Sequence, residues 1–215
     1  MRWDYVYRME DVLDLYQEPF DPLRPVVCFD ERPYQLVGEV RTPVPAAPGR
    51  RLRFDYEYRR RGTVNLFLLF QPLAGWRHVE VTERRTNADF AHQMKALVDV
   101  HFPQAERIRV VLDNLSSHSG AALYETFEPA EARRLVCKLE FHYTPKHGSW
   151  LNMAEMELSV LGRQCLDRRI PSPERLRSEI AAWEKTRNEQ RAQVTWRFTV
   201  PNARAKLHRL YSSKP

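Results

Sequence analysis

Cysteine is scarce in the sequence, and long hydrophobic runs are missing from it. The three cysteines, Cys28, Cys137 and Cys165, are widely spaced within apolar stretches, which favours buried reduced thiols over disulfides or a zinc knuckle. No apolar run approaches the roughly 20 residues that a membrane-spanning helix needs. The N-terminus, residues 1–16, is amphipathic and carries acids, unlike a signal or transit peptide. These absences predict a cytoplasmic protein without a membrane partner.

Basic residues exceed acidic ones, with 34 lysines and arginines against 28 aspartates and glutamates, and the pI is about 9.4. A net charge of +6 permits a polyanionic partner such as DNA, although many proteins of this charge never bind nucleic acid. The 215 residues, 43% of them hydrophobic, are enough for one well-filled domain. We therefore expect one globular domain whose partner the charge alone does not identify.

The first half of the chain is predicted to form mainly strands after an initial helix. Apolar residues over 7–17 have helical spacing, and the prolines of the following EPFDPLRP end this helix. A short β-rich run follows at 26–30. Residues 51–58 alternate strictly between charged and apolar or aromatic side chains, which is typical of a half-buried strand. Residues 64–70 are apolar throughout, as in a central strand covered on both faces, and 75–83 alternate again.

The second half alternates helices with strands. A helix is expected over 86–102, with Thr86 or Asn87 as its N-cap. The other expected elements are strands at 107–113 and 134–144, a short helix ending at Phe127, and helices over 150–166, 174–187 and 202–210. This order of elements predicts an α/β domain built around one mixed sheet.

Three acidic residues occupy positions where active sites commonly form. Asp30 and Asp113 each end an apolar strand, and Glu155 lies in the first turns of an apolar helix. Either aspartate alone is explained at least as well by the start of a turn. Together, three carboxylates on separate elements suit Mg²⁺, which prefers oxygen ligands, and two such ions can act on a phosphodiester.

The stretch HGSWLNMAEMEL at 147–158 contains two glutamates, and helix geometry separates them. A rotation of roughly 100° per residue places Glu155 and Glu157 about 200° apart, so both cannot face one site. Glu155 shares a polar seam with Asn152 and Ser159, which slightly favours it. The periodicity leaves the choice between the two glutamates open.

Several blocks of sequence resemble one known family. VVCFDE at 26–31, VVLDNLSSH at 110–118 and YTPKHGSWLNMAE at 143–155, in this order, resemble the catalytic domain of DDE transposases in the mariner superfamily. The nearest likeness is to the bacterial insertion-sequence family six-thirty. DYEYRRRGT at 55–63 and WRFTVPNARAKLHRLY at 196–211 look like that family too.

The resemblance implies a ribonuclease H-like α/β fold with a mixed central sheet and helices on both faces. It also implies that Asp30, Asp113 and Glu155 bind two Mg²⁺ or Mn²⁺ ions, because Glu155 lies three positions after the asparagine of the Leu151-Asn152 pair. The implied reaction is cleavage at transposon ends followed by transfer of the 3′-hydroxyl strand into target double-stranded DNA. The implied location is bacterial and nucleoid-associated.

The sequence departs from the pattern of this family in two respects. Asp113 and Glu155 are further apart in sequence than is typical of the superfamily, which suggests an insertion around EPAEARRL at 128–135. Residues 1–22 are expected to form an N-terminal helix and linker, and 23–215 the catalytic domain, so the family's upstream helix-turn-helix domain is expected to be absent. A separate DNA-binding subunit, and a homodimer, are accordingly considered as partners.

Six further residues are candidates for orienting the carboxylates or contacting DNA. Each has a plain alternative: Glu31 points away from Asp30 along a strand, His118 caps a helix, and the others satisfy backbone groups or lie in solvated loops. The candidates are Glu31, Asn114, His118, Lys146, His147 and Asn152. Arg59, Arg60 and Arg61 are expected in a solvated turn, with phosphate contact as the alternative.

Two rival functions share this sequence evidence. A truncated or inactive transposase remnant would bind DNA or a full-length partner without catalysis, and the expected absence of the front domain favours it. A general DNA nuclease would keep the same fold and the same three acids. The presence of all three acids favours the active transposase.

Overall fold

A computed structural model of the chain describes residues 2–53, 55–115 and 118–212, and places a single five-stranded sheet at its centre, in the order β3-β2-β1-β4-β5. β1, β2 and β3 pair antiparallel, whereas β1, β4 and β5 run parallel, so the sheet is mixed as predicted. The strands are β1 (Val26–Glu39), β2 (Tyr58–Gln71), β3 (Trp76–Thr82), β4 (Ile108–Leu112) and β5 (Leu139–Tyr143).

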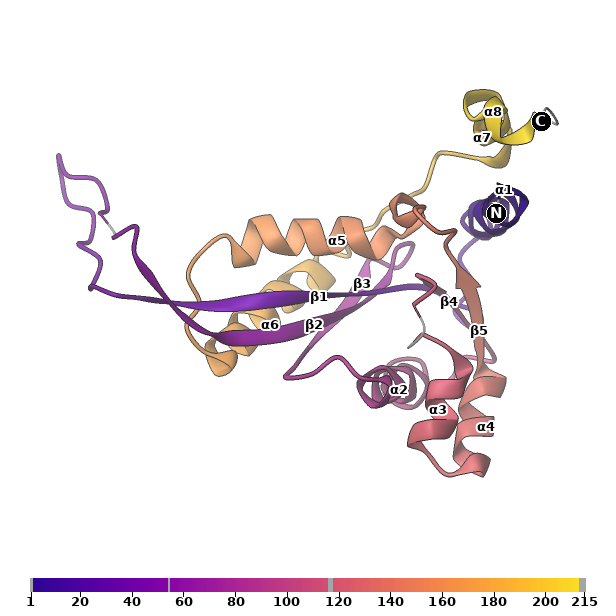
Figure 1. Cartoon of the computed structure of the whole chain (residues 1–215), viewed down its shortest axis with the longest axis horizontal. Helices are drawn as coiled ribbons and strands as arrows, with labels where there is room; N and C mark the ends of the chain where they lie inside the picture. The colour runs from indigo at the N-terminus through magenta and orange to yellow at the C-terminus, as the bar shows by residue number, and fades with distance from the viewer. Residues whose placement is uncertain (1, 54, 116–117, 213–215) are drawn as a thin grey trace.

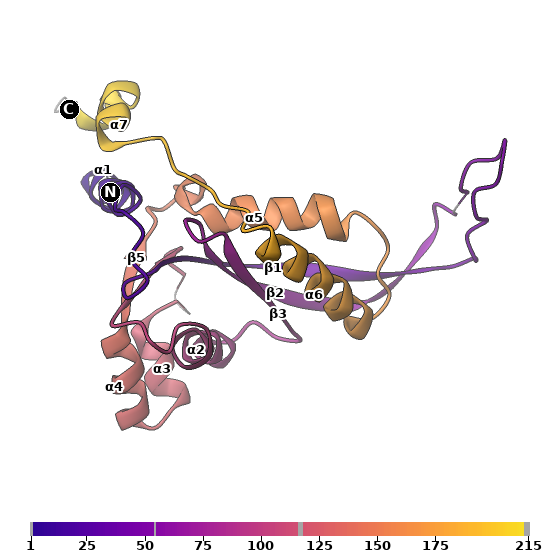
Figure 2. The ribbon, with the colours of Figure 1, turned by 180° about the vertical axis from the view of Figure 1, so that it is seen from behind.

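Helices cover both faces of the sheet, as Figures 1 and 2 show. One face carries α1 (Arg2–Leu15), α5 (Met153–Leu161, continued by the π-helical turn Gly162–Leu166), α6 (Pro173–Glu189) and α7 (Val200–Lys206). The other face carries α2 (Asn87–Ala96, continued by the π-helical turn Leu97–His101), α3 (Gly120–Thr126) and α4 (Pro129–Lys138). A short α8 (His208–Tyr211) follows α7, and a 3₁₀ turn (Ser149–Leu151) precedes α5.

A hydrophobic core lies on each face of the sheet, and successive side chains along each strand point alternately into one core and the other. On β1, Cys28 packs on the α5 face, whereas Val27 and Phe29 pack on the α2 face. On β4, Val111 lies on the α5 face and its neighbours Val110 and Leu112 on the other. This alternation fixes which face of the sheet each site residue meets.

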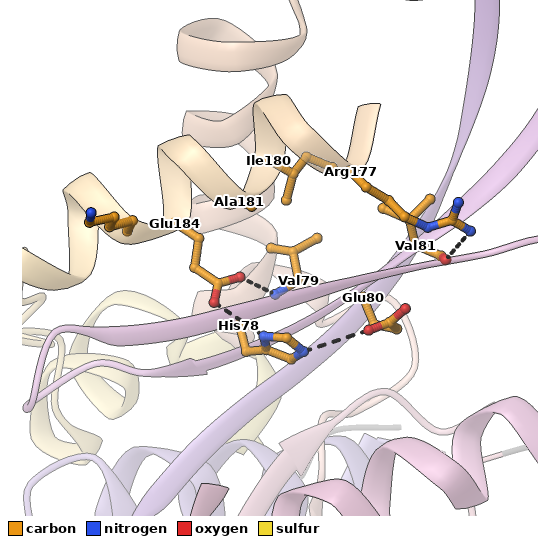
Figure 3. Close-up of a pocket in the computed structure, with 9 residues that line it drawn as sticks. His78, Val79, Glu80, Val81, Arg177, Ile180, Ala181 and Glu184 are labelled. Atoms are coloured by element: carbon orange, nitrogen blue, oxygen red, sulfur yellow. Dashed lines mark hydrogen bonds and ion pairs between the residues drawn. The ribbon is translucent and has the colours of Figure 1, made fainter. Parts of the chain in front are cut away.

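The open edge of β3 is covered by side chains of α6. Asn188 accepts a hydrogen bond from the Arg77 backbone N–H (2.9 Å) and donates to the Arg77 carbonyl (2.8 Å). Glu184 accepts from the Val79 N–H at 2.9 Å, and Arg177 donates to the Val81 carbonyl at 3.2 Å (Figure 3). These bonds satisfy edge groups that would otherwise be free to pair with another strand.

The strand predicted at 51–58 is wrong. β2 begins only at Tyr58, and the preceding residues belong to a long projection that joins β1 to β2 and extends away from the body (Figure 1). Within it, only the isolated bridges Val44 with Arg53 and Ala47 with Arg50 are found among the described residues. The alternating pattern fails there because no core lies beside the projection to bury the apolar set.

The strand predicted at 134–144 is half wrong. Its first five residues belong to α4, and only Leu139–Tyr143 forms β5. Pro129 starts the helix at a position where its missing N–H costs nothing, and Ala132 and Leu135 bury one helical face. The suspected insertion at 128–135 is therefore the start of this helix.

The other predicted helices and strands are observed with shifted ends, except that the helix predicted over 202–210 is divided into α7 and α8. The turn predicted at Arg59, Arg60 and Arg61 is wrong, because these residues belong to β2. Thr86 caps α2 through a capping box with Asp89, and the N-terminal helix α1 runs from Arg2. Met9, Val12 and Leu13 of α1 are fully buried, so this helix packs as part of the core. No helix in the described part of the chain is long and apolar enough to cross a membrane.

Candidate active site

Asp30 and Asp113 lie side by side at the edge where β1 and β4 separate. The parallel register pairs Val26 with Arg109 and continues to Cys28 with Val111. Asp30 and Asp113 each follow the last of these partners by two positions, so both side chains start from equivalent points. Because side chains alternate along a strand, Asp30 points to the same face as Cys28, which is the face covered by α5.

Asn152 attaches the start of α5 to β1 beside Asp30. Its side-chain oxygen accepts from the Ala154 N–H at 3.1 Å, which caps α5, and its amide donates to the Phe29 carbonyl at 2.8 Å. Asn152 is buried, so both bonds are shielded from water. The bonds place Glu155, the third residue of α5, in the first turn of a helix held against β1.

The pKa of Asp30 is influenced by the other carboxylates around it. The pKa of Asp30 is raised to about 7, chiefly by burial and in smaller part by the negative charges of Glu31, Glu155 and Asp113, while a hydrogen bond from the Glu31 N–H opposes the rise. Like charges this close disfavour ionisation unless a cation joins them. Among the described residues, neither Asp30 nor Glu155 forms an ion pair with a basic side chain.

His118 contacts two acids, Asp113 and Glu31, on the side of β1 opposite to Asp30. Its Nδ1 lies 2.5 Å from Asp113 Oδ1, and its Nε2 lies 3.0 Å from Glu31 Oε2. Arg85 contacts the other oxygen of Glu31 at 3.3 Å. Burial of the His118 ring lowers its pKa, but the bonds to Asp113 and Glu31 outweigh this effect and raise the pKa to about 9. Imidazolium at His118 therefore fixes the orientation of Asp113.

Glu157 is held in a buried ion cluster away from Glu155. Only 2% of Glu157 is exposed, and its carboxylate lies 2.9 Å from Arg77 Nε and 3.0 Å from Arg187 Nη2. Arg77 is itself fully buried and also donates to the carbonyls of Gly75 and Ala192. Glu155 is exposed, so the two glutamates occupy opposite environments on α5.

The remaining candidates lie on exposed loops. Asn114 is exposed next to Asp113, and Lys146 and His147 are exposed in the loop before α5. His147 has a positive φ of 64°, a conformation that non-glycine residues seldom adopt outside tight turns. No side-chain hydrogen bond from these three residues to the described chain is found.

The carboxylates approach one another without forming a closed cage. Over residues 2–53, 55–115 and 118–212, no group of three or more His, Cys, Asp or Glu side chains is close enough to hold a metal ion. The site is instead an open arrangement of acids carried by β1, the end of β4 and α5.

Sequence reasoning missed the arginines that hold the surrounding acids. Arg85 contacts Glu31, and Arg77 and Arg187 contact Glu157. One signal was present: Arg77 shares its face of an alternating strand with Val79 and Val81, and a charge on an apolar face requires a buried partner.

Solved structures of the Mos1 mariner transposase share the fold. The paired-end complex with Mn is 18% identical with a TM-score of 0.60, and the strand transfer complex is 16% identical with a TM-score of 0.61. Each match covers 89% of this chain and 57% of the other, so the chain spans little more than half of those proteins. The catalytic domain of Mos1 alone is 15% identical, with a TM-score of 0.56, over 89% of this chain and 91% of that domain. These likenesses show a ribonuclease H-like transposase fold.

The family comparison extends over most of the chain. A search of curated proteins finds no match. The family model of the DDE superfamily endonucleases matches residues 25–177, a range that contains β1, β4, α5 and the three acids. The chain therefore belongs to the DDE superfamily of endonucleases.

Proposed function

We propose that the chain is the catalytic part of a DNA transposase that cleaves double-stranded DNA at transposon ends and joins the freed 3′-hydroxyl to target DNA. The observation that carries this proposal is the convergence of Asp30, Asp113 and Glu155 at one edge of the sheet, where burial and mutual repulsion raise the Asp30 pKa. Membership of the DDE endonucleases and the Mos1-like fold support it.

In this proposal Asp30, Asp113 and Glu155 hold two divalent cations, Mg²⁺ or Mn²⁺. The donor set fits such ions because all three groups are carboxylates and Asp30 and Glu155 have no basic partner among the described residues. The open arrangement also fits, since Mg²⁺ usually keeps several waters and takes only one or two carboxylates besides substrate phosphates. The structure of the Mos1 complex with Mn is consistent with this assignment.

Two metal ions held by these acids would supply an activated water or hydroxyl and would neutralise charge on the leaving oxygen. The protein's own part is to hold the acids in place. His118 orients Asp113 and is anchored by Glu31, while Asn152 ties the helix that carries Glu155 to the strand that carries Asp30. Asn114, Lys146 and His147 border this edge and are proposed to contact the DNA strand.

The test uses labelled duplex DNA that carries transposon ends, with Mg²⁺ or Mn²⁺. We expect Asp30→Asn, Asp113→Asn and Glu155→Gln each to lower nicking and strand transfer by about 100-fold or more, because each removes a metal ligand. The matched control is Asp14→Asn, which removes an exposed carboxylate on α1 that forms no ion pair with the described chain.

The outcomes separate the rival functions. Cleavage without joining, at sites unrelated to transposon ends, would favour a general nuclease. Duplex binding with neither nicking nor joining in both metals would favour an inactive remnant. Equal activity in the three site variants and the control would remove these residues from the mechanism.

A further inference from the structure

A long arm projects from the sheet at the end of β1 that is remote from Asp30 (Figure 1). β1 and β2 remain paired as far as Glu39 with Tyr58, and the chain between them extends beyond the body in both views (Figures 1 and 2). From Asp30 to Glu39 the strand spans about 30 Å at roughly 3.3 Å per residue. That length parallels about nine base-pair steps of a duplex.

The base of this arm is held by Arg169. Its guanidinium forms an ion pair with Glu39 and donates to the carbonyls of Asp55 (2.6 Å) and Glu57 (2.9 Å). The two strands that leave the body are thus joined to the turn before α6. The direction in which the arm projects is set by these contacts.

The arm, defined as residues 40–53 and 55–61, carries almost all of the chain's excess positive charge. It contains seven arginines against two acids, so its net charge is +5 while that of the whole chain is +6. One arginine, Arg41, is paired with Asp55 at 3.5 Å. The other six are exposed and form no ion pair with any residue that the structure describes; they are Arg50, Arg51, Arg53, Arg59, Arg60 and Arg61.

We propose that this arm binds the sugar-phosphate backbone of a DNA duplex that lies across the active site. Unpaired exposed arginines held on a fixed projection match a phosphate backbone, and the exposed hydroxyls of Tyr56 and Tyr58 can bond phosphate oxygens as well. A second copy of this chain is a poorer partner, because its remaining surface carries only a small net charge. The inference rests on the proposed function, since it names how the same DNA substrate is held.

The test measures binding of a fluorescent 30-base-pair duplex in EDTA, so that catalysis does not enter. Two triple variants replace Arg50, Arg51 and Arg53, or Arg59, Arg60 and Arg61, with glutamine. Each is expected to weaken binding by about tenfold or more near 50 mM salt. Each should also reduce the slope of log K against log salt by up to about 2.7, or 0.9 per lost phosphate contact.

The matched control replaces three exposed arginines outside the arm, Arg24, Arg133 and Arg209, with glutamine and removes the same charge. The control should retain the parent slope. The arm's role would be overturned if the arm variants bind like the parent. It would also be overturned if the slope of log K against log salt falls as much in the control as in the arm variants. Arm variants that change only self-association in sedimentation would overturn it as well. A parent that binds no duplex would overturn the proposed function together with the arm.

Discussion

Two glutamates on α5 show how position within a helix decides the role of a residue. Glu155 is exposed in the first turn of α5, whereas Glu157, two positions on, is buried between Arg77 and Arg187. Removing the charge of Glu155 leaves no buried group without a partner, whereas removing the charge of Glu157 leaves buried arginines unpaired. The two substitutions should therefore affect different properties.

We predict that Glu157→Gln lowers the free energy of unfolding by about 3–5 kcal/mol, because it breaks a buried ion cluster from one side. Glu155→Gln should change the free energy of unfolding by no more than about 0.5 kcal/mol, as surface substitutions usually do. Urea unfolding monitored by circular dichroism measures both. Equal stability of the two variants would contradict the cluster as described.

Asn152 offers a second residue-scale prediction. Asn152→Ala removes the cap of α5 and its bond to the Phe29 carbonyl, which should cost about 1–2 kcal/mol and release Glu155 from its place. Ser172→Ala removes the corresponding cap of α6, remote from the acids, and serves as control. We expect similar losses of stability in both variants, with a loss of nicking activity only in Asn152→Ala. Unchanged activity in Asn152→Ala would argue against its positioning role.

Helix geometry predicted that Glu155 and Glu157 cannot face one site, and the family resemblance selected Glu155 with Asp30 and Asp113, but the sequence could not assign the partners of Glu157. Arg77 and Arg187 come from β3 and α6, which are brought to α5 only by the tertiary fold. The contact between His118 and Glu31 could not be predicted for the same reason, because His118 lies in the segment between β4 and α3 and meets β1 only in the tertiary fold.

At the scale of elements, α6 protects the edge of the sheet through side chains rather than through backbone pairing. Glu184 and Arg177 bond backbone groups of Val79 and Val81 (Figure 3). Asn188, further along the same helix, bonds both backbone groups of Arg77. An uncovered edge strand is a template for association with another chain.

We predict that Asn188→Ala lowers the free energy of unfolding by about 1–3 kcal/mol, because it leaves both backbone groups of Arg77 without their partner. It should also increase self-association, measured by light scattering at rising protein concentration. Lys185→Ala, on the exposed side of the same helix, should change neither quantity. An Asn188→Ala protein as stable and as monodisperse as Lys185→Ala would contradict the edge-covering role.

Element prediction succeeded where a hydrophobic pattern coincided with a real core and failed where it did not. The apolar run at 64–70 and the alternation at 75–83 became β2 and β3 because both face packed helices. The equally regular alternation at 51–58 lies in the arm, where Leu52, Tyr56 and Tyr58 are exposed. Residues 134–138, predicted as a strand, belong to α4 instead, because the burial of Ala132 and Leu135 stabilises a helix that continues through them.

At the scale of the whole molecule, the sheet separates two hydrophobic cores, and the proposed metal site lies where β1 and β4 separate. The basic arm lies at the far end of the same β1 strand that carries Asp30. In this account the acids bind metal cations at the centre of the molecule, and the arginines bind phosphates further out. Such a separation of charge suits an enzyme that acts on a nucleic-acid backbone.

The central claim is that Asp30, Asp113 and Glu155 form one divalent-metal site. Mn²⁺ bound per chain, counted by electron paramagnetic resonance in the presence of duplex DNA, tests it independently of activity. We predict two ions for the parent and fewer for Asp30→Asn, Asp113→Asn and Glu155→Gln, with thermal unfolding midpoints close to that of the parent. Undiminished Mn²⁺ binding in all three folded variants would contradict the claim.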